Sequence, residues 1–139
     1  MENKISFTSF YNWLKTTEMF ARPSKQLPGK WQLVEYYIET GNELLNIKEA
    51  ELAVKKEFWT IEFTAESKFY HQQNLPVSLI SNVKNGEWLI LKNYIVFTFS
   101  DNKNDNLRFQ FSVENKRLKL LKKDTLGRIE FFGFFNKIN

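Results

Sequence analysis

The amino-acid sequence predicts a mainly β protein: an antiparallel up-and-down β-barrel of eight or nine strands, with an N-terminal helix and a helix between the first two strands. In residues 27–34, a Pro28-Gly29 break precedes a strand whose first large side chain is Trp31. Behind it, short segments of alternating apolar and polar residues follow at hairpin spacing. Aromatic residues make up 17% of the chain, 14 of them Phe, so large rings are available to fill a barrel or to line a cavity in it.

The chain has 139 residues, which is the size of one domain and enough for a hydrophobic core without covalent cross-links. We divide it into a helical leader at residues 1–26 and a β-barrel domain at residues 27–139. Cysteine is absent, which excludes a disulfide framework and thiol catalysis. The net charge of +4 is modest, whereas dedicated nucleic-acid-binding proteins are usually more basic, so we expect no nucleic-acid partner.

No apolar run approaches the roughly 20 residues of a membrane-spanning helix, and residues 1–25 lack the apolar segment of a signal peptide. If Met1 is the native start, we therefore expect a cytoplasmic protein with no membrane span.

Apolar residues in the leader follow the i, i+3, i+4, i+7 spacing of one helix face: Phe7, Phe10, Tyr11 and Leu14. The predicted helix ends before Arg22-Pro23, because the residue that precedes a proline avoids helical dihedral angles. We expect it either to seal the bottom or flank of the barrel or, with the additional rings of Trp13 and Phe20, to dock on a protein partner through residues 1–24.

The first strand is expected from about residue 30 to residue 39, with apolar residues on both faces, as in a strand that is covered on two sides. Thr40 and Glu43 then have capping-box spacing, which predicts a helix that continues to about Lys55. We interpret this helix as a lid at the barrel mouth or as a packed crossover between the first two strands.

Alternation and turn residues predict further strands at 58–64, 68–72, 77–83 (a short edge strand), 88–91, 94–100, 107–113, 117–122 and 128–136. Between the third and fourth of these, Asn85-Gly86 predicts a hairpin, because Asn-Gly accepts the positive φ angles of two-residue turns. The clearest strand is 107–113, in which Leu107, Phe109 and Phe111 alternate with polar residues.

Gly29-x-Trp31 at the start of an ordered series of strands resembles the lipocalins and the wider calycin group. The chain is most similar to the bacterial lipocalin-like domain proteins. Their recurring pattern is a short strand with a Trp, a tight turn and then an alternating strand, and residues 86–97 resemble it. The whole resemblance covers residues 27–136. Lipocalins usually have a late arginine that packs on the first-strand Trp. Here an antiparallel final strand carries the last arginine, Arg128, away from Trp31 and leaves Lys137 near it.

Residues with catalytic potential are few. His71 is the only histidine and no Gly-x-Ser-x-Gly motif is present, so a Ser-His-Asp system would depend wholly on His71. We expect His71 to be hydrogen-bonded or exposed at a strand end; the alternative is haem ligation inside the barrel. One histidine and no cysteine make a zinc site unfavourable. We therefore expect no enzymatic activity, cofactor or metal.

Two charged features need interpretation. Glu35 and Glu62 lie inside strands with a strong alternation of apolar and polar residues. If Glu35 shares the face of Trp31, we expect it to orient the polar end of a ligand or to pair with Arg108 or Arg128. Otherwise we expect it to face water or a neighbouring charge. The basic run at 116–123 resembles a single-strand-binding surface, but its alternating leucines favour a solvated strand face.

We therefore expect non-catalytic binding of a small apolar or amphipathic molecule in the barrel. The predicted ligand-binding residues, chosen by strand phase, are Trp31, Glu35, Trp59, Phe63, Phe97, Phe109, Phe111 and Phe131. The alternative is a filled barrel that acts as a protein–protein interaction or assembly module through its N-terminal helix and aromatic surface. The doublets Phe131-Phe132 and Phe134-Phe135 favour it, because a strand places the rings of each doublet on opposite faces.

Overall fold

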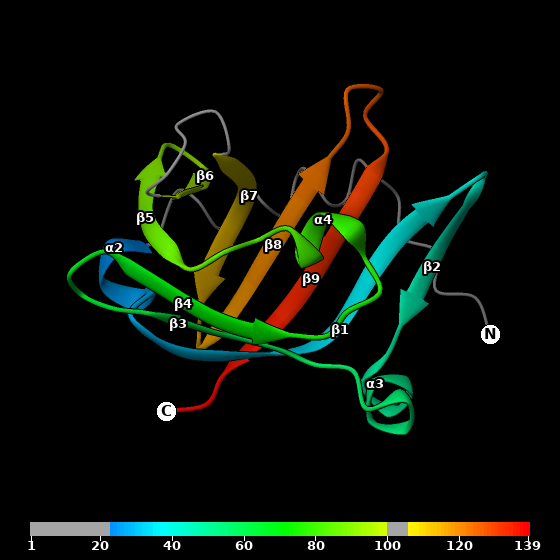
Figure 1. Cartoon of the computed structure of the whole chain (residues 1–139), viewed down its shortest axis with the longest axis horizontal. Helices are drawn as coiled ribbons and strands as arrows, with labels where there is room; N and C mark the ends of the chain where they lie inside the picture. The colour runs from blue at the N-terminus through cyan, green and yellow to red at the C-terminus, as the bar shows by residue number, and fades with distance from the viewer. Residues whose placement is uncertain (1–22, 100–105) are drawn as a thin grey trace.

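The computed structural model describes residues 23–99 and 106–139, which form one antiparallel sheet of nine strands (Figure 1). Eight of them close into a barrel, because β1 pairs with both β3 and β9; β2 is an additional strand on β1. The strands are β1 (Gly29–Thr40), β2 (Glu43–Ile47), β3 (Trp59–Phe63), β4 (Lys68–Gln73), β5 (Gly86–Leu91), β6 (Tyr94–Thr98), β7 (Leu107–Glu114), β8 (Arg117–Lys123) and β9 (Ile129–Lys137). Three short helices accompany them within the described residues: α2 (Pro23–Gln26), α3 (Glu49–Lys55) and α4 (Ser78–Ser81). The predicted barrel of eight or nine strands is therefore confirmed.

β1 is the longest strand and organises the barrel. Its first residues pair with β3, its last residues pair with β2, and its other edge pairs with β9. The register with β9 shifts between Leu33 and Glu35, which is a β-bulge. As a result the inward-facing residues of β1 are Trp31, Leu33 and then Tyr36, which all belong to the buried core. Simple alternation would place Glu35 on the inner face, but the bulge places it on the outer face.

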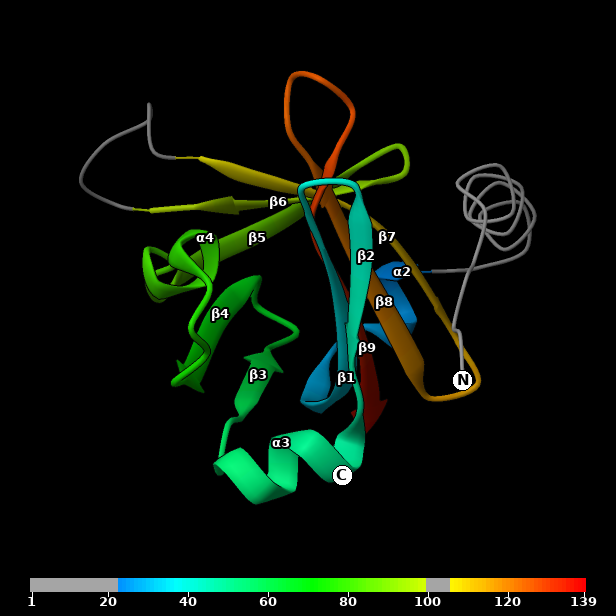
Figure 2. The same cartoon turned by 90° about the vertical axis from the view of Figure 1, so that its right-hand side faces the viewer.

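The helix predicted from Thr40 to Lys55 is wrong in its first half. The chain turns at Gly41, whose φ is 59°, and returns as β2 along the part of β1 that β3 does not pair with. The helix between β1 and β3 is only α3, where the Glu51 carboxylate accepts a hydrogen bond from the Lys48 backbone N–H at 3.4 Å. Figure 2 shows the β1–β2 hairpin with α3 at its foot.

The edge strand predicted at 77–83 is also wrong, because this segment contains α4. Its apolar residues Val77, Ile80 and Val83 recur every three positions, which suits a helical turn better than a strand. Ile80 and Val83 join the barrel core. β4 and β5 pair only at Lys68–Glu87 and Phe69–Gly86, and α4 belongs to the connection between them.

Asn85-Gly86 does not form the predicted hairpin, because no strand precedes it. Asn85 instead accepts a hydrogen bond from the His71 backbone N–H through its side-chain oxygen, at 3.0 Å. A Cβ on Gly86 would collide with the Thr98 carbonyl oxygen, so glycine is required here by the close approach of β5 and β6.

Inward-facing rings fill the barrel. The Trp59 ring centroid lies 5.5 Å from that of Phe131 and 5.3 Å from that of Phe135, both edge to face. Phe69 and Phe97 stack with centroids 4.2 Å apart. Such ring pairs stabilise a core beyond their area burial, by about 0.5–1.5 kcal/mol each. The described part of the barrel interior is therefore packed with side chains.

The predicted N-terminal helix falls in residues 1–22, outside the described residues. None of the helices in residues 23–99 and 106–139 has the length and apolar character of a membrane span.

Candidate functional site

The structure brings the seven predicted aromatic ligand-binding residues together in one core. Each is at most 2% exposed: Trp31, Trp59, Phe63, Phe97, Phe109, Phe111 and Phe131. Several contact one another, as in the Phe97–Phe109 pair at 5.5 Å between ring centroids and the Phe109–Phe131 pair at 6.5 Å. They lie where strand phase predicted, on the inner face, and five of them pack ring to ring: Trp59, Phe63, Phe97, Phe109 and Phe131.

Glu35 lies apart from these rings. It is in register with Phe134, outside the barrel, because the bulge after Leu33 reverses its face. Its Oε2 accepts a hydrogen bond from Asn46 Nδ2 at 3.0 Å. Arg128 forms its ion pair with Glu39, with Nε 3.8 Å from Oε2. Glu35 therefore anchors β2 to β1 at the place where the hairpin leaves the barrel.

Lys137 takes the place beside Trp31 that the sequence predicted for it. The two residues are in register across β1 and β9, and the Lys137 ammonium lies 5.6 Å from the Trp31 ring centroid. The Trp31 indole N–H also donates a buried hydrogen bond to the Leu27 carbonyl at 2.8 Å. This cluster closes one end of the barrel.

His71 faces the core, and both of its ring nitrogens have partners. Nδ1 accepts a hydrogen bond from Trp59 Nε1 at 2.9 Å, and Nε2 lies 2.8 Å from the Val83 carbonyl oxygen. Burial lowers the pKa of His71 below its ordinary value of 6.5, and the Val83 hydrogen bond opposes this shift only in part. The expectation that His71 is hydrogen-bonded is met, although the residue lies among core rings.

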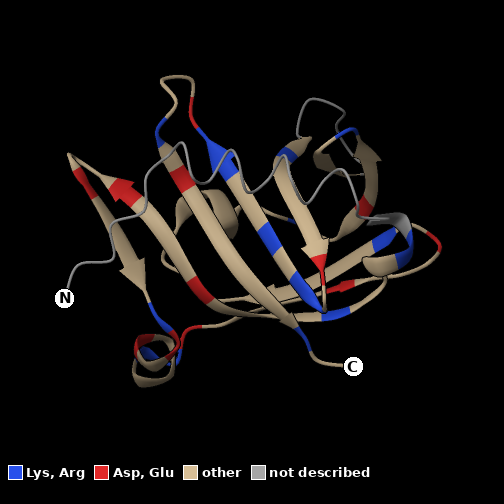
Figure 3. Ribbon diagram, turned by 180° about the vertical axis from the view of Figure 1, so that it is seen from behind, with Lys and Arg blue, Asp and Glu red and all other residues tan. Residues whose placement is uncertain are grey.

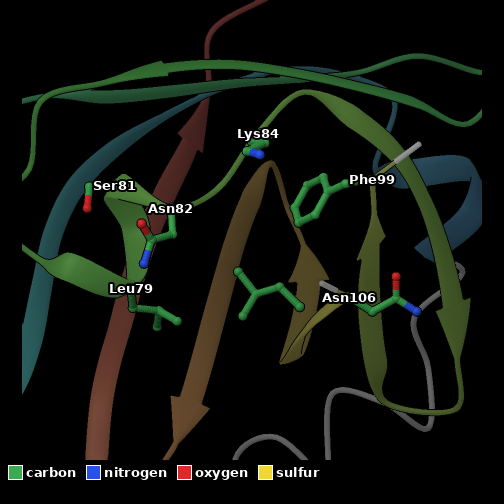
Figure 4. Close-up of a pocket in the computed structure, with 7 residues that line it drawn as sticks. Leu79, Ser81, Asn82, Lys84, Phe99 and Asn106 are labelled. Atoms are coloured by element: carbon green, nitrogen blue, oxygen red, sulfur yellow. The ribbon is translucent and has the colours of Figure 1, made fainter. Parts of the chain in front are cut away.

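A groove at the barrel rim offers a different site (Figure 4). We call it the rim groove. It has a volume of about 450 Å³ and is lined by Leu79, Ser81, Asn82, Lys84, Phe99, Asn106 and Leu107. These residues come from α4 and the loop after it, from Phe99 just after β6, and from Asn106 and Leu107 where β7 begins. Figure 4 shows the α4 residues on one side, Phe99 and Asn106 on the other, and Lys84 between them.

The floor of the rim groove is continuous with the core. Leu79, Phe99 and Leu107 are partly buried and pack against the buried cluster. Leu107 is in register with Phe97, one of the predicted ligand-binding residues. The apolar floor therefore extends the inward-facing rows of β6 and β7 to the barrel rim.

Among the described residues, the rim of the groove is polar and carries one cationic residue, Lys84. Ser81, Asn82, Lys84 and Asn106 are exposed. Their side chains supply hydroxyl and amide groups, and the Lys84 ammonium group can donate hydrogen bonds to an anionic group. Ligand sites commonly combine a largely apolar lining with a few polar groups that set orientation, within about 300–1,000 Å³.

Two further hollows that described residues line lie on the outer surface. One, of about 560 Å³, runs over β6–β8 and includes Arg108, Lys122 and Lys123. The other, of about 400 Å³, lies over β3 and β4 and includes Glu62, Tyr70 and His71. The first hollow shares Leu107 with the rim groove and also includes Leu121, whereas the other lining residues of both hollows are polar, charged or tyrosine side chains.

Sequence reasoning missed the rim groove because it read residues 77–83 as a strand. Four of the lining residues lie between positions 79 and 84, in α4 or just after it. The available signal was the spacing of Val77, Ile80 and Val83, which is helical.

Within the described ranges, no cluster of three or more His, Cys, Asp or Glu side chains is placed to hold a metal ion. Comparisons with protein-family models, with curated proteins and with solved structures found no match to this chain.

Proposed function

We propose that this protein binds, without catalysis, a small amphipathic molecule with an apolar chain and an anionic end, and that the binding site is the rim groove. The observation that carries the proposal is the combination of an apolar floor, formed by Leu79, Phe99 and Leu107, with the ammonium group of Lys84 at the rim. A carboxylate at the rim and an alkyl chain along the floor match this arrangement.

The apolar chain supplies most of the binding free energy in this proposal. Each buried CH₂ contributes about 0.8 kcal/mol, or about a fourfold change in dissociation constant. An exposed ion pair contributes at most about 1 kcal/mol, because water and salt screen it. Lys84 therefore orients the ligand and selects its charge, while chain length sets its affinity.

A homologous series of ligands tests the proposal. Hexanoate, octanoate and decanoate are titrated into the full chain by calorimetry, with octanol as the uncharged control. We expect affinity to rise about fourfold per added CH₂ until the floor is covered. We also expect octanol to bind more weakly than octanoate, and the difference to shrink at high salt. Affinity independent of chain length would contradict the proposal.

Kinship with the lipocalin-like proteins is part of the proposal. It is supported by the barrel that begins with Gly29 and Trp31, and by the Lys137 ammonium above the Trp31 ring, where those proteins usually have an arginine. The proposed ligand class agrees with that kinship, although the proposed site is at the rim and not among the core rings.

The packed interior favours a second candidate, an interaction module. Exposed apolar side chains that a partner could cover occur on β5, where Leu89 and Leu91 alternate with inward-facing Trp88 and Ile90. Sedimentation of the full chain over a range of concentrations, compared with a Leu89→Asp/Leu91→Asp variant, tests whether this row joins two copies. If the chain stays monomeric at all concentrations and also binds octanoate, ligand binding is the better account of its function.

A further inference from the structure

A second apolar cluster lies on the outer side of the barrel. We call it the outer apolar face; its buried members are Tyr37, Leu121, Ile129 and Phe132, and partly buried Leu44 and Phe134 pack against them. Leu121, Phe132 and Tyr37 form one cross-strand row, because Leu121 is in register with Phe132 and Phe132 with Tyr37. Figure 3 views the molecule from this side, where basic residues follow β8.

The residues of the outer apolar face are nearly inaccessible. Leu121, Ile129 and Phe132 are 1% exposed and Tyr37 is 5% exposed. Side chains on the outer side of a single-layered barrel stay exposed unless something lies over them. The three described helices do not provide this cover: Leu52 of α3 and Ile80 of α4 belong to the inner core, as does Leu27 just after α2. Another element must cover the face.

Lys119 points to the same conclusion. It is in register with Phe134 on the outer side of β8, and its ammonium lies 5.4 Å from the Phe134 ring centroid. Burial, with a smaller effect of Arg117, lowers the pKa of Lys119 to about 8, and Glu114 opposes the shift. The prediction that this basic strand is a simple solvated face does not hold at Lys119.

We propose that the chain's own residues 1–22 cover the outer apolar face, as an amphipathic helix that directs its apolar row at Leu121 and Phe132. The apolar row is the one that the sequence places at helical spacing: Phe7, Phe10, Tyr11 and Leu14. This occupant needs no second molecule.

Chain connectivity supports this occupant. α2 begins at Pro23 and packs against β7, the neighbour of β8, and the Gln26 carbonyl at its end lies 3.5 Å from Lys137 Nζ on β9. Phe132 lies five residues back along β9, about 17 Å away at about 3.3 Å per residue, which is within reach of a segment of 22 residues that precedes α2. A helix of about 14 residues is about 21 Å long, and the distance from β7 across β8 and β9 to β1 is about 14 Å at about 4.8 Å per strand. One helix of the predicted length can therefore span the face.

Paramagnetic relaxation in the full chain tests the proposal. The chain has no cysteine, so Asn12→Cys provides a single site for a nitroxide label, on the helix face opposite Phe10 and Leu14. We expect the label to reduce amide peak intensities selectively in β8, β9 and the adjoining part of β1. The loss should disappear in a Phe10→Asp/Leu14→Asp variant and persist in the matched Ser9→Asp/Thr16→Asp control.

Three outcomes would overturn the proposal. One is broadening centred on other strands, and another is weak broadening spread over the whole barrel. The third concerns a mixture of nitroxide-labelled chains that lack ¹⁵N with ¹⁵N-labelled chains that lack the nitroxide. Broadening of amide peaks in this mixture would show that the helix of a second copy covers the face. The indole N–H peaks of Trp31 and Trp59, both buried, report whether each variant keeps the native core.

Discussion

The indole N–H of Trp59 donates a hydrogen bond to Nδ1 of His71 at 2.9 Å, and this bond fixes the protonation state of the histidine. Because Nδ1 accepts, the ring proton must be on Nε2, which faces the Val83 carbonyl oxygen at 2.8 Å. The neutral ring thereby joins β3, β4 and the segment after α4. A second proton on Nδ1 would break the bond to Trp59.

Stability should fall as the pH is lowered from 7 to 5, and His71 should be a cause. The pKa of His71 is lowered in the folded state, so the unfolded chain binds more protons below pH 6.5, the ordinary value. The contribution is fully present above pH 6.5 and is lost as pH falls through the folded pKa. Urea unfolding at pH 7 and pH 5 measures the change. A His71→Gln variant should show a smaller difference between the two pH values, and an equal or larger difference would contradict this assignment.

Replacement of Trp31 by phenylalanine should destabilise the barrel by about 1–3 kcal/mol, because the buried Leu27 carbonyl would lose its donor. Lys137→Gln removes only the cation above the ring and should cost less, about 0.5–1 kcal/mol. Chemical denaturation of both variants measures the order. A larger loss in Lys137→Gln than in Trp31→Phe would be inconsistent with this packing.

Gly133 leaves room for a ring. A Cβ at this position would lie 2.5 Å from two ring atoms of Phe131, so Gly133→Ala should cost about 1–3 kcal/mol through overpacking. The penalty should be smaller when Phe131→Leu has already removed the ring. A double-mutant cycle measured by thermal or urea unfolding tests this coupling, and additive effects would argue against the contact.

Substitutions in the rim groove should separate charge from apolar contact. Lys84→Gln should weaken octanoate binding by up to about fivefold and leave octanol binding unchanged, because only the ion pair is lost. Lys55→Gln, on α3, is the matched control and should change neither. Phe99→Ala should weaken the binding of both octanoate and octanol, whereas its control Leu89→Ala, on the outer side of β5, should change neither affinity. Calorimetric titration supplies all eight comparisons.

Strict alternation predicted the strands well. In β7, Leu107, Phe109, Phe111 and Val113 alternate with polar or small residues, and only one face of such a strand can enter a core. The prediction of Lys137 beside Trp31 succeeded for a related reason, since an antiparallel last strand fixes which of its ends meets the start of the first.

Features that depend on distant partners could not be predicted. The bulge that turns Glu35 outward occurs where β1 changes its partner from β3 to β2, and local sequence does not report that change. In the sequence Gly86 indicates a turn, whereas in the structure glycine is needed because a Cβ at this position would collide with the Thr98 carbonyl oxygen. The rim groove was missed for a local reason, the strand assigned where α4 lies.

The central claim is that an amphipathic anion binds at the rim and not among the core rings. The most direct test is a titration of the isotope-labelled full chain with octanoate, followed by NMR of methyl, aromatic and indole N–H groups. We predict saturable shifts at Leu79, Phe99 and Leu107, with little change at the indole N–H groups of Trp31 and Trp59, which are hydrogen-bonded inside the barrel. Large shifts at those two indoles with an unchanged rim, or no saturable shift anywhere, would contradict the account.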